Sequence, residues 1–301
     1  MVSVALPHIS VCICTYKRPE SLTRLLCDLA RQDTARSFTY SIVVIDNDQL
    51  RSAAPVVARW AAGSPIPVGY FVEPRQNIAL ARNKAVMNAQ GDFVAFIDDD
   101  EFPMPQWLLS LLSTLREYGT DGVLGPVRPH FDDRAPRWVK EGRFYERPLH
   151  STGMRLVWSQ CRTGNVLIKS AVFAEEEQPF NPECLSGEDL DFFKRMTDKG
   201  RVFVWCNEAV VYEDVPPARW KRTFLVRRAL FKGVFSLRHR RSTVPIATSL
   251  IAAPAYAVAA PLALVLGQAQ FMRCVFKSCY HTGRLLSLLG MNPVKGAYVT
   301  D

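Results

Sequence analysis

Three consecutive aspartates, Asp98, Asp99 and Asp100, directly follow an apolar run. Neighbouring negative charges destabilise one another unless a cation or a proton intervenes. A hard divalent ion accepts such oxygens, and Mg²⁺ is commonly held by one or two carboxylates together with substrate phosphates. Because side chains alternate along an extended segment, Asp98 and Asp100 should point to one side and Asp99 to the other. We expect Asp100 to bind a metal and Asp98 to contact its water shell or a ribose, the alternative being a solvated acidic loop that caps the next helix.

Two other acidic segments could also do chemistry. Asp46 ends the apolar run 41–46, where it could cap a turn or accept a hydrogen bond from the edge of a nucleobase such as uracil. Glu188 and Asp189 follow Gly187, just before a helical pattern. Asp189 could cap that helix. If desolvated and close to a hydroxyl, the same carboxylate could act as a general base.

The elements that must position these groups alternate between strands and helices. Apolar, β-branched runs predict strands at 9–14, 41–46, 67–72 and 93–97. Amphipathic spacing predicts helices at 20–31, 52–62 and 79–90. This order indicates an α/β fold with a mostly parallel, Rossmann-like sheet covered by helices on both faces. Ligands of such sheets bind at the carboxyl ends of the strands, where Asp46 and Asp98 lie.

Composition and charge narrow the class of protein. The 301 residues are 48% hydrophobic and 22% charged, which excludes disorder, collagen-like repeats and a disulfide-stapled miniprotein. Residues 215–301 contain 13 Lys and Arg against one acid, whereas residues 1–214 contain 24 bases and 28 acids. A uniformly basic nucleic-acid-binding protein has a different distribution, so we expect no nucleic-acid partner.

The eight cysteines and the N-terminal sequence indicate a cytoplasmic body. None of the cysteines forms a C-x-x-C pair and several lie in apolar runs, which favours free thiols in a reducing compartment. The first residues lack the basic and long apolar regions of a signal peptide.

The C-terminal part has the pattern of a membrane-associated tail. Residues 246–266 are uncharged and long enough to cross a hydrocarbon core of ~30 Å, although they include two prolines. The cluster RHRR at 238–241 precedes them, which fits the positive-inside rule. Residues 273–290 read as a basic amphipathic helix with Arg273, Lys277 and Arg284 on one stripe. A spanning helix, a re-entrant or surface hairpin, and a buried hairpin of a soluble protein all remain open.

The sequence thus divides into a catalytic domain at 1–214, a basic helix or linker at 215–241 and a membrane-associated tail at 242–301. With the positive-inside pattern, this organisation predicts a membrane location with the domain at 1–214 facing the cytoplasm.

Several spaced motifs occur in one order over about 200 residues. They are VCICTYKRPESLTRLL, VVIDND, EPRQNIALARNKAV, GDFVAFIDDDEFP, TGNVLI and SGEDLDFFKR. Together they resemble glycosyltransferase family 2, the inverting enzymes with the GT-A fold, and in particular the bacterial exopolysaccharide enzymes of the succinoglycan type. The resemblance covers residues 8–235.

The resemblance assigns a role to each matching residue. The residues that it implies for nucleotide binding are Thr15, Tyr16, Asp46 (on uracil), Arg82 and Asp98. The D-x-D ends, Asp98 and Asp100, would bind Mg²⁺ or Mn²⁺. Asp189 would be the catalytic base with Glu188 beside it. The residues implied for the sugar and acceptor pocket are Gly164, Asn165 and Gly187. The segment after residue 214 resembles the family's basic helix, so Arg219 and Arg227 are candidates for phosphate contacts.

One position departs from the family pattern. Many relatives carry a metal-ligating histidine where this chain has Glu213 and Asp214, so the third protein ligand is either Glu213 or absent. The resemblance implies transfer of a sugar, from a UDP-sugar, to a hydroxyl of a glycan or a lipid-linked acceptor in cell-surface polysaccharide synthesis. A lipid-linked acceptor would lie at the membrane surface, and the resemblance to bacterial enzymes implies a bacterial inner-membrane location with the catalytic domain facing the cytoplasm.

Other functions fit less well. A dinucleotide-dependent oxidoreductase needs a glycine-rich turn after the first strand, and residues 12–24 contain no glycine. A sugar nucleotidyltransferase would need a glycine-rich, lysine-bearing phosphate loop, which the TYKRP turn does not supply. A non-catalytic scaffold on the membrane surface would explain the basic tail but not the carboxylates that end two strands.

Overall fold

The computed structural model describes residues 6–184, 187–238 and 246–291. The chain divides into two compact units. The first consists of Met1–Arg128 and Arg147–Glu213, and the second of Pro129–Glu146 and Asp214–Asp301. Residues 129–146, which the sequence places in the catalytic domain, therefore group with the C-terminal part of the chain.

A seven-stranded sheet forms the centre of the first unit, in the order β3-β2-β1-β4-β8-β6-β9. Its strands are β1 (His8–Thr15), β2 (Thr39–Asp46), β3 (Val68–Val72), β4 (Phe93–Ile97), β6 (Gly122–Leu124), β8 (Asn165–Lys169) and β9 (Phe203–Trp205). The first four strands of this order are parallel, β8 is antiparallel to both of its neighbours, and β6 and β9 are parallel. The predicted α/β fold with a mostly parallel sheet is confirmed.

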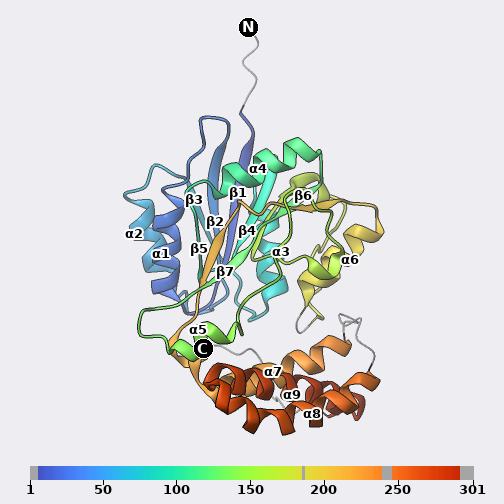
Figure 1. The fold of residues 1–301 in the computed structure, drawn as a ribbon. Helices are drawn as coiled ribbons and strands as arrows, with labels where there is room; N and C mark the ends of the chain where they lie inside the picture. The colour runs from blue at the N-terminus through green and yellow to red at the C-terminus, as the bar shows by residue number, and fades with distance from the viewer. Residues whose placement is uncertain (1–5, 185–186, 239–245, 292–301) are drawn as a thin grey trace. The chain divides into compact units, whose positions relative to one another are not determined.

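Helices cover both faces of this sheet (Figure 1). One face packs against α1 (Pro19–Leu29), α2 (Ala54–Ala61) and α4 (Trp107–Tyr118). The other packs against α3 (Ile78–Asn88) and α6 (Glu188–Asp198). Alternation along β1 explains the two cores, because Ile9, Val11 and Ile13 enter the first and Cys12 enters the second.

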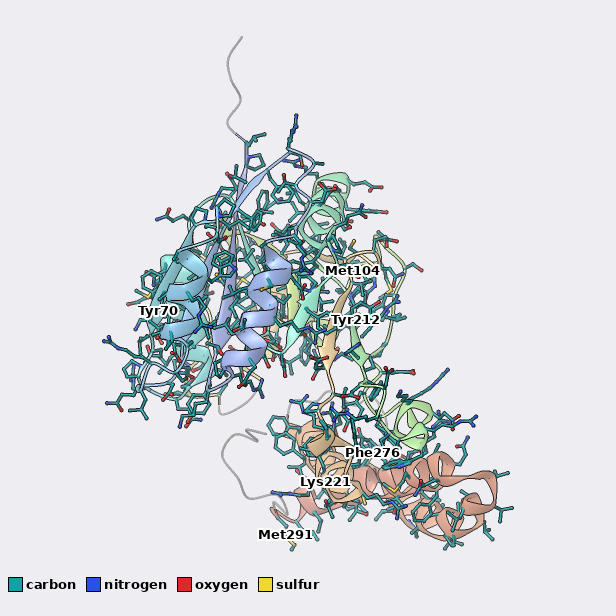
Figure 2. The ribbon with its side chains drawn as sticks, turned by 90° about the vertical axis from the view of Figure 1, so that its left-hand side faces the viewer. Tyr70, Met104, Tyr212, Lys221, Phe276 and Met291 are labelled. Atoms are coloured by element: carbon teal, nitrogen blue, oxygen red, sulfur yellow. The ribbon has the colours of Figure 1, made fainter. Side chains whose placement is uncertain are left out.

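A small second sheet lies after the aspartate triplet. It has the order β5-β10-β7, from β5 (Glu101–Pro103), β10 (Val211–Asp214) and β7 (Val127–His130). Strands β5 and β10 are antiparallel and place Glu213 opposite Glu101. Next to this pair, the ring of Tyr212, labelled in Figure 2, stacks on Phe102 with centroids 5.4 Å apart. The pairing thus joins a residue of the aspartate turn to one more than 100 positions later.

The second unit is helical. Its helices are α5 (Arg137–Gly142), α7 (Arg222–Arg238), α8 (Ala247–Ala263) and α9 (Gln268–Leu288), and short 3₁₀ turns occur at Pro217–Trp220 and Leu264–Leu266. Helix α9 packs against α7, α8 and α5. The apolar core of the unit consists of Val139, Phe144, Tyr145, Val215, Leu225 and Met272.

The tail differs from the sequence expectation at its basic residues. The expected helix is present as α9, but only Lys277 of its three bases is exposed. Arg273 donates to the main-chain carbonyls of Glu141 and Gly142 at the end of α5, and Arg284 is buried. The three bases therefore do not form one outward stripe, because α9 packs against neighbours on several sides.

The apolar run at 246–266 forms α8 and the 3₁₀ turn that follows it. Within the described ranges, this is the one helical segment that is long and apolar enough to cross a membrane. Residues 239–241 of the basic cluster lie outside the described residues.

Candidate functional site

The chain turns sharply after β4, and this turn determines where the three aspartates point. The main-chain N–H of Glu101 donates to the carbonyl of Asp98 at 3.1 Å. Asp99 and Asp100 both accept from the guanidinium of Arg18, at 3.0 and 3.1 Å. The expected alternation, with Asp98 and Asp100 on one side, is therefore wrong, because the segment is a turn and not an extended strand.

Asp99 is a structural residue of this turn. Its carboxylate is almost fully buried and also accepts from the hydroxyl of Thr15 at 2.7 Å. Thr15 is the last residue of β1, so this bond and the Arg18 ion pairs attach the loop after β1 to the aspartate turn. Tyr16, the next residue, is partly exposed in the same loop. The predicted nucleotide loop and the D-x-D segment are thus adjacent.

The side chain of Asp98 points toward Arg82. This arginine lies at the centre of the site. The guanidinium of Arg82 forms an ion pair with Glu188 and lies 3.7 Å from a carboxylate oxygen of Asp98. Burial would lower the pKa of Arg82, but the charges of Glu188, Asp98 and Asp189 together raise it above its ordinary value. A single buried cation thus holds acidic groups from two separate segments of the chain.

Helix α3 fixes the position of Arg82. The side chain of Asn77 caps the helix by accepting from the main-chain N–H groups of Ala79 and Leu80 at 2.9 and 3.2 Å. Asn83, next to Arg82, exchanges two hydrogen bonds with the main chain of Phe180, at 2.7 and 2.8 Å. These contacts tie α3 to the segment that leads into α6.

Glu188 and Asp189 form the first turn of α6. Gly187, with φ of 85°, is the N-terminal cap, so the alternative that Asp189 caps the helix is wrong. Glu188 is buried against Arg82, whereas Asp189 is partly exposed and accepts from the N–H of Leu190 at 2.8 Å. Asp189 also lies close enough to Arg162 to oppose the lowering of that residue's pKa by burial. A partly exposed carboxylate between two arginines can approach a bound hydroxyl.

Glu101, directly after the triplet, has an unusual environment. It is 2% exposed, and one of its carboxylate oxygens accepts from the N–H of Asp98 at 3.2 Å. The other oxygen, Oε1, is buried without a hydrogen-bond partner among the described residues. Burial, reinforced by the charge of Asp98, raises the pKa of Glu101 well above its usual range. An unpaired buried carboxylate is costly, so a bound cation or hydroxyl group would stabilise it.

Gly164 lies against the same two acids. A Cβ on this glycine would be 2.8 Å from Oε1 of Glu101 and 2.9 Å from Oδ2 of Asp98. The absence of a side chain at Gly164 therefore leaves these oxygens facing a common point.

The acidic groups fit a divalent ion that is held partly by a ligand. No group of three or more His, Cys, Asp or Glu is arranged as a complete metal site in the part of the chain that the structure describes. Mg²⁺, however, needs only one or two protein carboxylates when phosphates supply other oxygens. The side chain of Asp98 is 46% exposed, and the buried Oε1 of Glu101 lies next to it. Glu213, the possible third ligand, is held by Arg147 at 2.5 Å.

Two predicted site residues are engaged in the fold. The buried carboxylate of Asp46 accepts from the N–H groups of Asp48 and Ala53, at 3.1 and 2.7 Å, and from the hydroxyl of Tyr70 at 2.8 Å. The amide of Asn165 donates to the carbonyls of Pro126 and Ala209 and accepts from the indole of Trp107. Asp46 is nevertheless paired in register with Thr15, so it ends its strand beside the nucleotide loop.

The remaining candidates belong to the second unit. Arg219 is buried in the 3₁₀ turn before α7, and Arg227 is exposed on α7. Their roles as phosphate contacts stay predictions. Sequence reasoning missed four charged residues around the acidic groups: Arg18, Glu101, Arg147 and Arg162.

Comparison with known proteins identifies the sequence pattern. Residues 10–171 match the model of the family described as Glycosyl transferase family 2. The chain is 36% identical over 231 residues to the succinoglycan biosynthesis protein ExoM of Rhizobium meliloti (strain 1021), a match that covers 75% of this chain and 73% of ExoM.

Solved structures show the same fold. The mannosyltransferase PcManGT of Pyrobaculum calidifontis, in complex with GDP-Man and Mn²⁺, aligns with a TM-score of 0.65 at 17% identity, over 96% of this chain and 89% of that one. Residues 1–349 of TarS from S. aureus, in complex with UDP, align with a TM-score of 0.55 at 17% identity, over 95% and 93% of the two chains.

Proposed function

We propose that this chain, which belongs to glycosyl transferase family 2, transfers a sugar from a UDP-sugar to a hydroxyl of a glycan or lipid-linked acceptor, with inversion at the anomeric carbon. The observation that carries the proposal is the convergence of Asp98, Glu188 and Asp189 on the buried Arg82. The name of its relative ExoM, a succinoglycan biosynthesis protein, supports an acceptor in cell-surface polysaccharide synthesis.

In this proposal the residues around Arg82 have separate tasks. The carboxylate of Asp189 removes the proton from the acceptor hydroxyl, whose oxygen then bonds to the anomeric carbon while the bond to the diphosphate breaks. Glu188 holds Arg82 in place by an ion pair, and Arg82 would contact the donor phosphates. Gly164, Asn165 and Gly187 shape the sugar pocket.

The leaving group would carry negative charge that this acidic site must balance. Asp98, with Glu101 or Glu213 beside it, would hold Mg²⁺ or Mn²⁺, and Asp100 would join it only by turning away from Arg18. A bound ion would supply positive charge for the departing diphosphate. The complex of PcManGT with Mn²⁺ supports such a site in this fold. Arg219 and Arg227 are our candidates for further phosphate contacts.

The base of the donor is proposed from the complexes of TarS and from Asp46. TarS has been solved with UDP and with UDP-GlcNAc, whereas PcManGT has been solved with GDP-Man. Asp46 is fully buried and accepts from Asp48, Ala53 and Tyr70, so a contact with the N–H of uracil would require the loop after β2 to open, and the assignment of uracil rests mainly on the TarS complexes. Thr15 and Tyr16 would frame the same nucleotide.

We also propose that the enzyme works at the cytoplasmic face of the bacterial inner membrane. The basic residues 215–301, with their single acid, and the apolar helix α8 support attachment to a membrane surface. A lipid-linked acceptor would be presented at that surface.

The test is a screen of labelled sugar nucleotides with membranes that contain lipid-linked oligosaccharide. Replacing Asp189 by Asn should lower the transfer rate about 10²- to 10⁴-fold, because a general base is removed. Stabilisation of the variant by UDP with Mn²⁺, measured as a melting temperature, should persist. Asp191→Asn is the matched control, since Asp191 lies in the same helical turn but pairs with Arg195. Equal losses in both variants, or undiminished transfer by Asp189→Asn, would contradict the assignment.

A further inference from the structure

Helix α8 has the reverse of the pattern that a helix of a water-soluble bundle has. Its outward face consists of Leu250, Ile251, Val258 and Leu262, which are 65–74% exposed. Its inward face includes Ser249, which is fully buried and lies 3.0 Å from a ring nitrogen of His281 on α9. The polar contacts are thus inside the helix pair and the large apolar side chains outside, as expected for a surface that contacts lipid.

The two other long helices of this unit carry charge along their length. Arg227 and Lys232 are exposed in the middle of α7, and Lys277 is exposed in the middle of α9. Helix α9 packs against both α7 and α8. If α8 stood perpendicular to the membrane plane, it would therefore carry the charges of α7 and α9 into the hydrocarbon. Each such charge costs several kcal/mol at the centre of a bilayer, so the packed bundle is unsuited to crossing it.

The start of α9 is also fixed within the second unit. Arg273 donates to the carbonyls of Glu141 and Gly142, and Met272 packs in the core with Val139 and Val215. If α8 crossed the membrane, α9 would begin on the far side and these contacts would be lost. These contacts are retained only if both ends of α8 lie on the same side of the membrane.

The prolines of α8 favour a shallow position. Pro254 and Pro261 lack an N–H, so the carbonyls four residues earlier, of Leu250 and Ala257, have no donor at the usual helical position. All four residues are exposed. Such carbonyls are costly in hydrocarbon, whereas water and headgroups at the interface can donate to them.

A basic and aromatic rim borders the apolar face. The ammonium of Lys277 lies 5.0 Å from the ring centroid of Tyr256 on α8. Lysine and tyrosine at the edge of an apolar surface keep their polar ends at the headgroup level. Residues 215–301 carry 13 Lys and Arg and a single acid, which is complementary to anionic lipid.

We propose that α8 lies in the plane of an anionic lipid surface, with Leu250, Ile251, Val258 and Leu262 inserted between the headgroups and with α7 and α9 above it. The helix does not cross the bilayer, so both ends of α8 stay on the side of the membrane that the catalytic unit occupies. This inference rests on the proposed membrane attachment and goes beyond it, because it specifies the binding face and the topology.

Vesicle binding of the full-length protein tests the face. The protein should co-sediment with vesicles of phosphatidylglycerol and phosphatidylcholine, and less with phosphatidylcholine alone. Ile251→Asp with Val258→Asp should weaken binding at least about tenfold, because two apolar side chains no longer insert. The matched control, Met87→Asp with Val157→Asp, changes two exposed apolar residues of the first unit and should bind as the wild type does. Equal binding by both double variants would overturn the proposal.

Three further measurements test the topology of the chain, the depth of α8 and the binding partner of its apolar face. A fluorescent protein fused after residue 301 should fold in the cytoplasm, and alkaline phosphatase fused there should be inactive; an active phosphatase means that the chain crosses. In the variants Ile251→Trp, Val258→Trp and Val265→Trp, brominated lipid should quench the added fluorescence, relative to the wild type, to an equal extent, whereas unequal quenching means a re-entrant helix. A different outcome would mean that the apolar face binds a second copy of the chain. In that case the wild type forms dimers without lipid, whereas the variant with Ile251→Asp and Val258→Asp is monomeric and binds vesicles as the wild type does. None of these measurements uses sugar transfer. Results that contradict the proposed position of α8 would therefore not contradict the proposed transferase activity.

Discussion

At Gly164 the main chain passes so close to Asp98 and Glu101 that a methyl group would lie within 3 Å of both carboxylates. Gly164→Ala should therefore displace both acids from their common point. We expect kcat/KM for sugar transfer to fall at least about tenfold while the melting temperature changes by only a few degrees. Gly63→Ala is the control, because nothing lies within 4 Å of a Cβ at Gly63. If the transfer rate of Gly164→Ala equals that of the wild type, Glu101 and Gly164 do not contribute to the site.

The thiol of Cys14 is next to the same charged groups. Burial raises its pKa to about 12, Arg82 opposes this shift, and Asp98 adds to it. At pH 8 only on the order of one part in 10⁴ of Cys14 is thiolate, the reactive form. Iodoacetamide should therefore modify the exposed Cys27 and leave Cys14 unmodified, as read by peptide mass spectrometry, and the rate at Cys14 should rise with pH well above 9. Equally fast modification of the two thiols in the folded protein would contradict this.

The acids of the site could be predicted from sequence, and several of their partners could not. Asp98 and Asp189 stand in local motifs, after an apolar strand and before a helix, so their neighbours in sequence identify them. Arg18 has no such signal, because its partners Asp99 and Asp100 are about 80 residues away and meet it only after the sheet forms. In the sequence, Glu101 has the pattern of an ordinary surface acid. It is buried because β5 pairs with β10.

At the scale of elements, α7 and α9 cross at two glycines. A Cβ on Gly233 would be 2.1 Å from the carbonyl oxygen of Tyr280, and one on Gly283 would be 2.2 Å from that of Leu230. Each backbone therefore fits against the other only without a side chain at the crossing. Gly283→Ala should destabilise the second unit by about 1–3 kcal/mol, measured as a lower urea midpoint, although alanine is the better helix former. A midpoint equal to that of the wild type would mean that the helices can separate without cost.

The longer elements were predictable and the shorter ones were not. The strands that end at Asp46 and Ile97 and the helices α1 and α3 lie within about two residues of the predicted ranges, because each has an apolar run or a helical stripe. Strands β5 and β6 have only three residues each, too few for any periodicity. Their existence depends on partners that come later in the chain.

At the scale of the whole molecule, residues 129–146 depend on the C-terminal helices. Val139 and Phe144 share an apolar core with Leu225 and Met272, and the ring of Phe276, labelled in Figure 2, lies 5.7 Å from that of Phe144. A chain that ends at residue 241 loses α9 and exposes this core. We expect such a chain to aggregate and to bind a hydrophobic dye, measured by gel filtration and fluorescence.

A chain that ends at residue 291 retains α9 and serves as the control. If the shorter chain is instead monomeric and melts at the same temperature, residues 129–146 do not need the helices.

The order of the two units along the chain limits how they can be exchanged between relatives. The second unit is built from an internal segment and a C-terminal segment, so the chain leaves the first unit after Arg128, returns at Arg147 and leaves again after Glu213. A hybrid that grafts only a foreign C-terminus would pair a new α9 with the old α5, and the carbonyls of Glu141 and Gly142 would lose their donor wherever the new helix lacks an arginine at position 273. A graft that keeps these contacts must therefore carry both segments of the second unit, and with them all three junctions, together.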